Sequence, residues 1–214
     1  FSINTFNLIK NLDMKNKKFV IIDVMALAYR AYFAFINRPL TNSKGESTSA
    51  VYGFLSQLIK VIEDHRPDYL AVAFDSKEKT FRHEQYANYK SSRQKMPEDM
   101  IPQIGRIREF IEILNIPVYI LPRYEADDII GTAVRKAEKL GLDSFAITPD
   151  KDYFQLVTDN VKVIRPGKSS DEPVLYDKEK TIDCVAAPSA VLRSGEVYPI
   201  NNRIRNRKIH GSTF

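Results

Sequence analysis

The middle of the chain alternates between short apolar runs and longer segments of helical character. Short continuous apolar runs are typical of buried parallel strands, and they fall at residues 19–24, 69–75, 118–121, 144–148 and 161–164. Helical composition or helical spacing of apolar residues characterises the segments between them, at residues 25–37, 51–62, 97–114 and 125–140. Strands that alternate with helices predict an α/β fold, with a mostly parallel central sheet and helices on both faces.

The composition excludes several classes of protein. The 214 residues are 43% hydrophobic, which is enough for the core of one ordinary domain. There is no run of about eighteen apolar residues to cross a membrane, and the N-terminus has no signal-peptide pattern. A single cysteine, Cys184, excludes an internal disulfide, and the three scattered histidines give no metal-ligand spacing. These features favour a cytoplasmic protein with no membrane partner.

The two ends of the chain differ from its middle. The first methionine is Met14, and lysines and an apolar run follow it, so residues 1–13 are expected to be a non-native or disordered leader. The domain itself is predicted at residues 14–180. The pattern of strands and helices fades over residues 181–214, which include a basic stretch. This segment is either a nucleic-acid-binding tail or, in the favoured interpretation, a truncated or frame-shifted end.

Acidic residues mark the ends of the predicted strands. Parallel strands point their carboxyl ends toward one edge of the sheet, where ligands bind in α/β proteins. Carboxylates gathered there repel one another unless cations neutralise them, and oxygen donors without His or Cys select Mg²⁺ or Mn²⁺. The sequence therefore predicts a metal site formed by Asp23, Asp75, Glu125, Asp127, Asp128, Asp150 and Asp152.

Each acid, taken singly, also fits a structural role. The acids at 125–128 suit the first turn of a helix, Asp75 suits a helix cap, and those at 150–152 suit a turn. Asp23 is the exception, because it interrupts an apolar run where no turn is expected. Acids from four separate segments at one sheet edge favour the metal site. Two Mg²⁺ ions about 3.5–4 Å apart in such a site suit phosphodiester hydrolysis.

A basic segment supplies the complementary charge. Residues 81–95 carry four Lys or Arg side chains against one acid, Glu84, with tyrosines interleaved. Cations bind phosphates and aromatic rings stack on unpaired bases, so this pattern predicts a surface for single-stranded nucleic acid. The alternative is a solvated polar loop. The candidate residues are Arg82, Tyr89, Lys90, Arg93 and Lys95.

The ordered set of motifs resembles the 5′–3′ exonuclease domain of bacterial DNA polymerase I, within the flap endonuclease family. The resemblance covers about residues 17–180. Its matching stretches are Ile22-Asp23, Leu27-Ala28-Tyr29-Arg30, Ser49-Ala50-Val51-Tyr52-Gly53-Phe54, Ala73-Phe74-Asp75, Phe81-Arg82-His83-Glu84, Tyr89-Lys90 with Arg93, Tyr124-Glu125-Ala126-Asp127-Asp128, and Thr148-Pro149-Asp150-Lys151-Asp152 with Gln155-Leu156.

The resemblance implies a PIN-like 5′ nuclease fold with a basic helical-arch segment, and a metal-dependent nuclease that acts on DNA with 5′ ends or flaps. The predicted acids match the metal-binding acids of the family. Lys90 and Arg93 match catalytic cations at the base of the arch that contact the scissile phosphate, and Tyr89 matches an aromatic position near the same gateway. Whether a polymerase domain follows on the native chain is left open by the resemblance.

The sequence departs from the family pattern in two places. Val24 stands where many members have glycine. The Gly-Asp-x-x-Asp-Asn segment and the helix-hairpin-helix clamp are not matched after Lys180, which leaves the activity of this chain open. The alternatives are a non-catalytic DNA-binding remnant and a PIN-type ribonuclease. No glycine pair has the spacing of a dinucleotide-binding or P-loop site.

Overall fold

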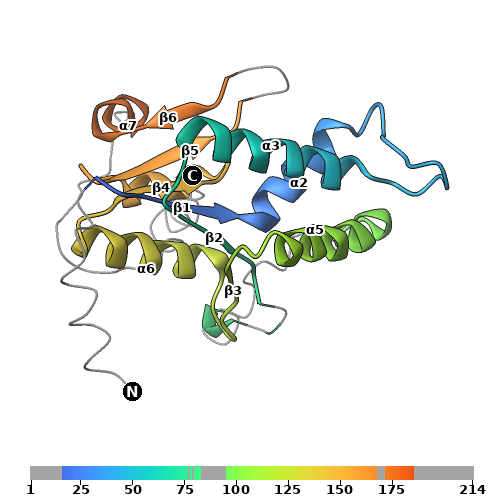
Figure 1. The fold of residues 1–214 in the computed structure, drawn as a ribbon, viewed down its shortest axis with the longest axis horizontal. Helices are drawn as coiled ribbons and strands as arrows, with labels where there is room; N and C mark the ends of the chain where they lie inside the picture. The colour runs from blue at the N-terminus through green and yellow to red at the C-terminus, as the bar shows by residue number, and fades with distance from the viewer. Residues whose placement is uncertain (1–15, 77, 79, 83–94, 168–171, 186–214) are drawn as a thin grey trace, which may run out of the picture.

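The architecture is a parallel sheet between layers of helices (Figure 1). It is seen in a computed structural model, which describes residues 16–76, 78, 80–82, 95–167 and 172–185. The sheet has six strands in the order β3-β2-β1-β4-β5-β6. Their bounds are β1 Lys18–Asp23, β2 Tyr69–Ala73, β3 Val118–Tyr119, β4 Asp143–Ile147, β5 Val161–Arg165 and β6 Val174–Tyr176.

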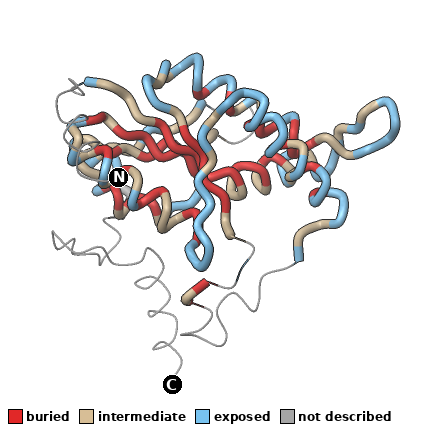
Figure 2. The backbone as a smooth tube through the Cα atoms, turned by 60° about the horizontal axis from the view of Figure 1, so that its bottom comes forward, coloured by how far each residue is buried: buried red, intermediate tan, exposed pale blue. Residues whose placement is uncertain are grey.

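Strand β1 is the centre of the sheet. It pairs in parallel with β2 on one side, where Ile21 lies opposite Ala71, and with β4 on the other, where Ile21 lies opposite Ala146. Val20, Ile21 and Ile22 are fully buried, because helices cover both faces (Figure 2). A strand buried on both faces has no polar alternation, which explains the continuous apolar run in the sequence.

Two hydrophobic clusters cover the two faces of the sheet. One joins alternate β1 residues, such as Val20 and Ile22, to the helices α2, α3 and α5. The other joins Ile21 to α6 and to the short 3₁₀ segment η2. The helix bounds are α2 Val24–Ala34, α3 Ser49–His65, η1 Glu98–Met100, α5 Ile101–Ile113, α6 Ala126–Lys139, η2 Lys151–Leu156 and α7 Lys178–Val185.

The predicted α/β architecture is confirmed, with local differences. The helix expected from Pro97 begins as the 3₁₀ turn η1 and becomes α-helical only at Ile101. The sequence pattern did not predict β6, which pairs antiparallel with β5, or α7. Gly141 follows α6 with a φ of +83°, as expected of a glycine that ends a helix. The predicted arch segment falls mostly at 83–94, outside the described residues.

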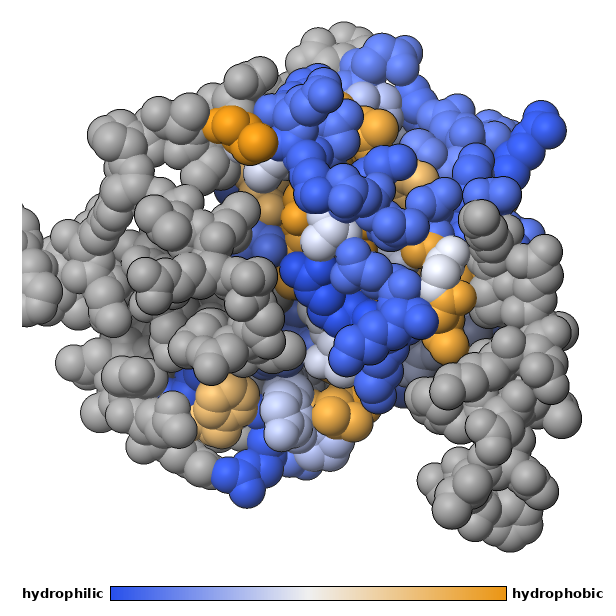
Figure 3. Space-filling view, turned by 90° about the vertical axis from the view of Figure 1, so that its left-hand side faces the viewer, coloured by the Kyte–Doolittle hydropathy of each residue, from blue (hydrophilic) through white to orange (hydrophobic). Residues whose placement is uncertain are grey.

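The side of the molecule where the strands begin is largely polar. Figure 3 shows the side that faces left in Figure 1, and hydrophilic side chains predominate on its described surface. Among the described residues, no helix combines the length and apolar character needed to cross a membrane.

Helices α2 and α3 pack with their backbones close together at Gly53. A Cβ atom added at Gly53 would lie 2.7 Å from the Cβ of Ala31. We therefore expect Gly53→Ala to lower the free energy of unfolding by about 1–3 kcal/mol through overpacking, as measured by chemical denaturation. Gly105→Ala in α5 is the matched control, because nothing lies within 4 Å of its added Cβ. It should be neutral or stabilising by up to about 1 kcal/mol. Equal effects of the two substitutions would contradict this packing.

Candidate active site at the carboxyl edge of the sheet

The carboxyl ends of three parallel strands deliver the predicted acids to one edge. Asp23 is the last residue of β1, Asp75 follows β2 by two residues, and Asp150 follows β4 by three. The acids at 125–128 lie at the beginning of α6, which packs against β1 and β2. The parallel order of the sheet therefore brings together segments that are far apart in the sequence (Figure 1).

Asp23 is buried at the centre of this edge, with 5% of its surface exposed. Its Oδ1 accepts a hydrogen bond from the backbone N–H of Ala26 at 3.0 Å, so Asp23 is the N-cap of α2. The expectation that Asp23 has no local structural role was wrong, since α2 begins directly after β1. Its Oδ2 accepts from the Thr148 hydroxyl at 3.2 Å.

Tyr153 links two of the acids. Its hydroxyl lies 3.2 Å from Oδ2 of Asp23 and 2.8 Å from Oδ1 of Asp127, and its side chain is fully buried. A phenol has a single proton, so Tyr153 can donate to only one of the two carboxylates at a time. The sequence analysis missed Tyr153 and Thr148. For Thr148 a signal was available, because this polar residue ends an apolar stretch two residues before Asp150, whereas Tyr153 stands in a mixed segment and resembles an ordinary core residue.

The remaining strand-end acids also form caps. Asp75 Oδ1 accepts from the backbone N–H of Ala126 at 2.8 Å, and so it caps α6 from a different segment of the chain. Asp150 Oδ1 accepts from the backbone N–H of Asp152 at 2.9 Å and caps η2. These acids therefore have structural roles beside their place at one edge, although Asp75 caps a helix from a distant segment and not one that directly follows it.

Burial and mutual repulsion perturb the two central acids. Burial raises the pKa of Asp23 from 3.8 to about 7, and the charges of Asp127 and Asp75 add to this shift. Burial likewise raises the pKa of Asp127 to about 6, with further contributions from Asp75, Asp150 and Glu125. Both shifts show that this edge disfavours a further negative charge when no cation is bound.

Arg82 was predicted to lie on a DNA-binding surface, but the structure places it inside the protein. It is 1% exposed, and its two terminal nitrogens donate to the two carboxylate oxygens of Asp128 at 2.6 and 2.7 Å. Its Nη1 also lies 3.5 Å from Glu125. The prediction failed because the 81–82 segment packs inward against α6. Two predicted metal ligands thus contact an internal cation.

The other predicted basic residues are only partly within the described part of the chain. Lys95 is exposed. Tyr89, Lys90 and Arg93 lie outside the described residues. Their predicted roles stay predictions.

The donor chemistry of this edge suits a hard divalent cation. The groups there that could bind a cation are mainly carboxylates, and oxygen donors without His or Cys favour Mg²⁺, Ca²⁺ or Mn²⁺. In the described parts of the chain, no group of three or more His, Cys, Asp or Glu side chains is arranged so that it would hold a metal ion as it stands. The carboxylates of Asp23, Asp75 and Asp127 instead accept hydrogen bonds from protein groups. The residues therefore fit the ion in type, and their side chains must reorient to bind it.

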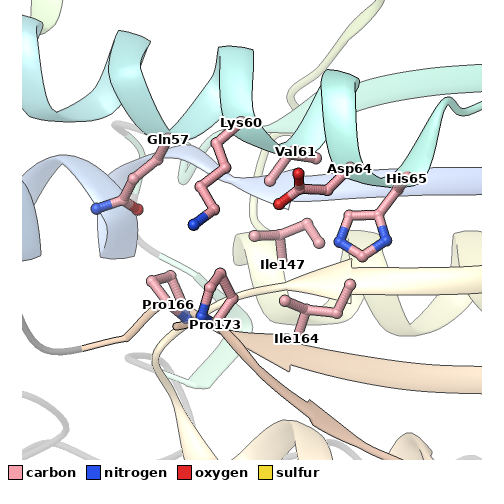
Figure 4. A pocket seen from close by; sticks show the side chains of 9 residues that line it. All are labelled: Gln57, Lys60, Val61, Asp64, His65, Ile147, Ile164, Pro166 and Pro173. Carbon is pink, nitrogen blue, oxygen red and sulfur yellow. The ribbon is translucent and has the colours of Figure 1, made fainter. Parts of the chain in front are cut away.

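A small pocket on the α3 side of the sheet is a poor alternative site. It lies between α3 and strands β4 and β5, and Asp64, His65, Ile147 and Ile164 are among its lining residues (Figure 4). Its volume is about 30 Å³, which is room for about one water molecule. A nucleotide or nucleic acid does not fit there.

The family of the chain follows from its sequence match. A profile described as 5′-3′ exonuclease, N-terminal resolvase-like domain, matches residues 18–185. The chain belongs to this family. The DNA polymerase I of Chloroflexus aurantiacus is 45% identical over 163 residues, which are 75% of this chain and 17% of that protein. A 5′-3′ exonuclease of Aquifex aeolicus is 42% identical over 166 residues, which are 78% of this chain and 55% of that protein. The chain thus spans between a sixth and about half of the length of these relatives.

Solved structures confirm the PIN-like fold. A T5 5′-exonuclease with bound zinc superposes with a TM-score of 0.58 at 16% identity, covering 78% of this chain and 60% of that chain. The flap endonuclease-1 from Methanococcus jannaschii superposes with a TM-score of 0.51 at 19% identity, covering 83% and 61%. The fold that the sequence resemblance implied is therefore observed.

The raised pKa of Asp23 predicts the pH dependence of stability. The unfolded chain loses this proton near pH 4 and the folded chain near pH 7, so the folded state binds more protons between these values and becomes less stable as the pH rises. Asp23→Asn keeps the Ala26 cap and removes the charge. In EDTA at pH 7.5, it should raise the free energy of unfolding by on the order of 1 kcal/mol, or Tm by about 2–4 °C.

This gain should shrink as the pH is lowered from 7 toward 4, as followed by thermal denaturation. Glu63→Gln, at an exposed carboxylate on α3, is the matched control and should change Tm little at any pH. A gain from Asp23→Asn that does not depend on pH would contradict the assignment of the raised pKa.

Proposed function

We propose that this chain is a divalent-metal-dependent 5′ nuclease that hydrolyses phosphodiester bonds in DNA with 5′ ends or flaps. Membership of the 5′-3′ exonuclease family supports the reaction class. The observation that carries the proposal is the gathering of carboxylates from four segments at the carboxyl edge of the sheet. Burial, with their mutual repulsion added to it, raises the pKa of Asp23 and Asp127. A bound cation would relieve this repulsion.

The residues proposed to hold the metal are acids that face this edge. They are Asp23, Asp75, Asp127, Asp150 and Asp152, with Glu125 beside them. We propose two Mg²⁺ ions, which Mn²⁺ can replace. When bound, ions of this kind lower the pKa of a water nucleophile and stabilise the leaving oxygen of a phosphodiester. The T5 5′-exonuclease, which has the same fold, has divalent metal ions (zinc) bound to it, and this supports a divalent cation in the present chain.

The protein's own groups orient these acids. Thr148 donates to the Asp23 carboxylate, and Tyr153 lies within hydrogen-bond distance of both Asp23 and Asp127 and donates to one of them at a time. The Ala126 N–H fixes Asp75 at the beginning of α6. We further propose that Lys90 and Arg93 bind the scissile phosphate and offset the charge that develops in the transition state. Tyr89 and Lys95 would contact the DNA on either side of them.

The second candidate is a DNA-binding module that does not cut. One observation favours it: the described residues offer no ready-made metal site. The two candidates differ in the cleavage of bound DNA and agree in its binding. RNA of the same sequence tests the third alternative, a PIN-type ribonuclease.

The direct test is cleavage of a 5′-labelled flap DNA by the purified chain in Mg²⁺, Mn²⁺ or EDTA, with binding measured in the same samples. We expect a short 5′ product in either metal and none in EDTA. Asp127→Asn should remove cleavage and leave the protein folded by circular dichroism. Metal-independent cleavage, or full cleavage by Asp127→Asn, would contradict the site assignment. Binding without cleavage in either metal would support the non-catalytic module.

Lys90→Ala should separate chemistry from binding. We expect the single-turnover cleavage rate to fall by about 100-fold, because a cation opposite the developing charge is lost, while Kd for flap DNA changes by less than about threefold. Lys95→Ala is the control, and it should weaken binding by a few-fold and leave the rate at saturation unchanged. Equal losses of rate and binding for Lys90→Ala would make Lys90 an ordinary phosphate contact.

A further inference from the structure

The buried contact between Arg82 and α6 is the strongest feature that the metal site does not explain. The guanidinium of Arg82 spans both carboxylate oxygens of Asp128 in a bidentate pair, at 2.6 and 2.7 Å. The side chain of Arg82 is 2% exposed and that of Asp128 is 15% exposed. Bidentate Arg–carboxylate pairs are strong and geometrically specific, and burial makes the loss of one partner costly.

Phe81, directly before Arg82, contacts the segment that leads into α6. The Phe81 N–H donates to the Arg123 carbonyl at 3.2 Å, and the rings of Phe81 and Tyr124 lie 5.8 Å apart. The backbone next to Arg82 is therefore held against the residues that precede α6, and this directs the Arg82 side chain toward the helix. The interaction joins residues that are 46 positions apart in the sequence.

The oxygens of Asp128 are committed to protein donors. Oδ1 accepts from Nη2 of Arg82, while Oδ2 accepts from Nη1 of Arg82 and from the backbone N–H of Glu125 at 3.2 Å. The latter bond is half of a capping box between Glu125 and Asp128 that begins α6. Asp127 is the neighbouring residue on the helix, and its carboxylate contacts Tyr153 instead.

We infer that Asp128 is the structural partner of Arg82 and not a metal ligand, and that Arg82 is a positioning residue for the metal site. The pair fixes the first turn of α6, and this turn holds the carboxylate of Asp127 toward Asp23 and Tyr153. The inference rests on the proposed function only for its metal-binding part. It gives structural roles to Arg82, which the sequence pattern predicted to bind DNA, and to Asp128, which it predicted to bind metal.

A double-mutant cycle in EDTA tests the pairing, with Tm as the readout. Arg82→Met leaves the buried carboxylate of Glu125 and the partly buried one of Asp128 without their guanidinium and should lower Tm by about 10 °C. Asp128→Asn keeps the cap on Glu125; it should lower Tm of the unsubstituted chain by several degrees but raise Tm of the Arg82→Met variant. Asp127→Asn is the control and should shift Tm with the same sign in both backgrounds.

Equal effects of Asp128→Asn in the two backgrounds would overturn the pairing. If Arg82→Met does not fold at all, the prediction is that adding Asp128→Asn restores folding, and continued failure of the double variant counts against the pairing. Arg82→Lys, which keeps the charge and loses the bidentate geometry, should fall between Arg82→Met and the unsubstituted chain.

Binding of Mn²⁺ alone, followed by electron paramagnetic resonance of the free ion, tests the second half of the inference. Asp128→Asn should bind Mn²⁺ within about fivefold of the unsubstituted chain, while Asp127→Asn should bind at least about tenfold more weakly. Equal losses would make Asp128 a ligand and overturn the assignment. Arg82→Lys should weaken binding by about tenfold, because the first turn of α6 is less well held. Unchanged affinity would mean that Arg82 only stabilises the fold.

These outcomes are distinguishable from failure of the proposed function. If the unsubstituted chain binds no Mn²⁺ at millimolar concentrations, the proposed metal site is wrong, and the inferred positioning role of Arg82 is lost with it. The Tm cycle in EDTA still decides whether Arg82 and Asp128 are partners, because it requires no metal.

Discussion

Asp23 lies at the end of the central strand β1, and its carboxylate interacts with groups from four parts of the chain. It caps α2 through Ala26 and accepts from Thr148 and Tyr153, while the charges of Asp75 and Asp127 act on it from the neighbouring segments. The fold therefore gathers acids where burial and neighbouring charges disfavour their ionised form. Packing of the sheet on both faces supplies the rigidity that this arrangement needs, because β1 cannot shift without disturbing both clusters of the core.

The same carboxylates serve architecture and chemistry. Asp75 and Asp150 cap the N-terminal ends of α6 and η2, so a shift of either residue would also displace the acids on those segments. The site also divides its work between adjacent residues, since Asp127 faces Tyr153 while Asp128 faces Arg82. The guanidinium of Arg82 thus fixes the geometry from inside the protein. The remaining acids still repel one another, and an external cation would relieve that repulsion.

The sequence contained most of the fold and much of the site. Buried strands were predicted because a doubly covered strand such as β1 is uniformly apolar, and the edge of acids followed from the parallel order. Strand β6 was missed because its three residues are too few to show a period. The contact between Arg82 and Asp128 was missed because it depends on where a distant segment packs. Tyr153 resembles an ordinary core residue until its neighbours are placed.

Proton release on metal binding tests the central claim most directly, which is that a cation relieves the repulsion among these acids. Isothermal titration calorimetry with Mn²⁺ at pH 6.5, in buffers of different ionisation enthalpy, counts the protons released. With pKa values of about 7 for Asp23 and about 6 for Asp127, binding should release about one proton per chain at pH 6.5 and almost none at pH 8.5. Binding with no proton release at pH 6.5, or no binding at either pH, would contradict the account.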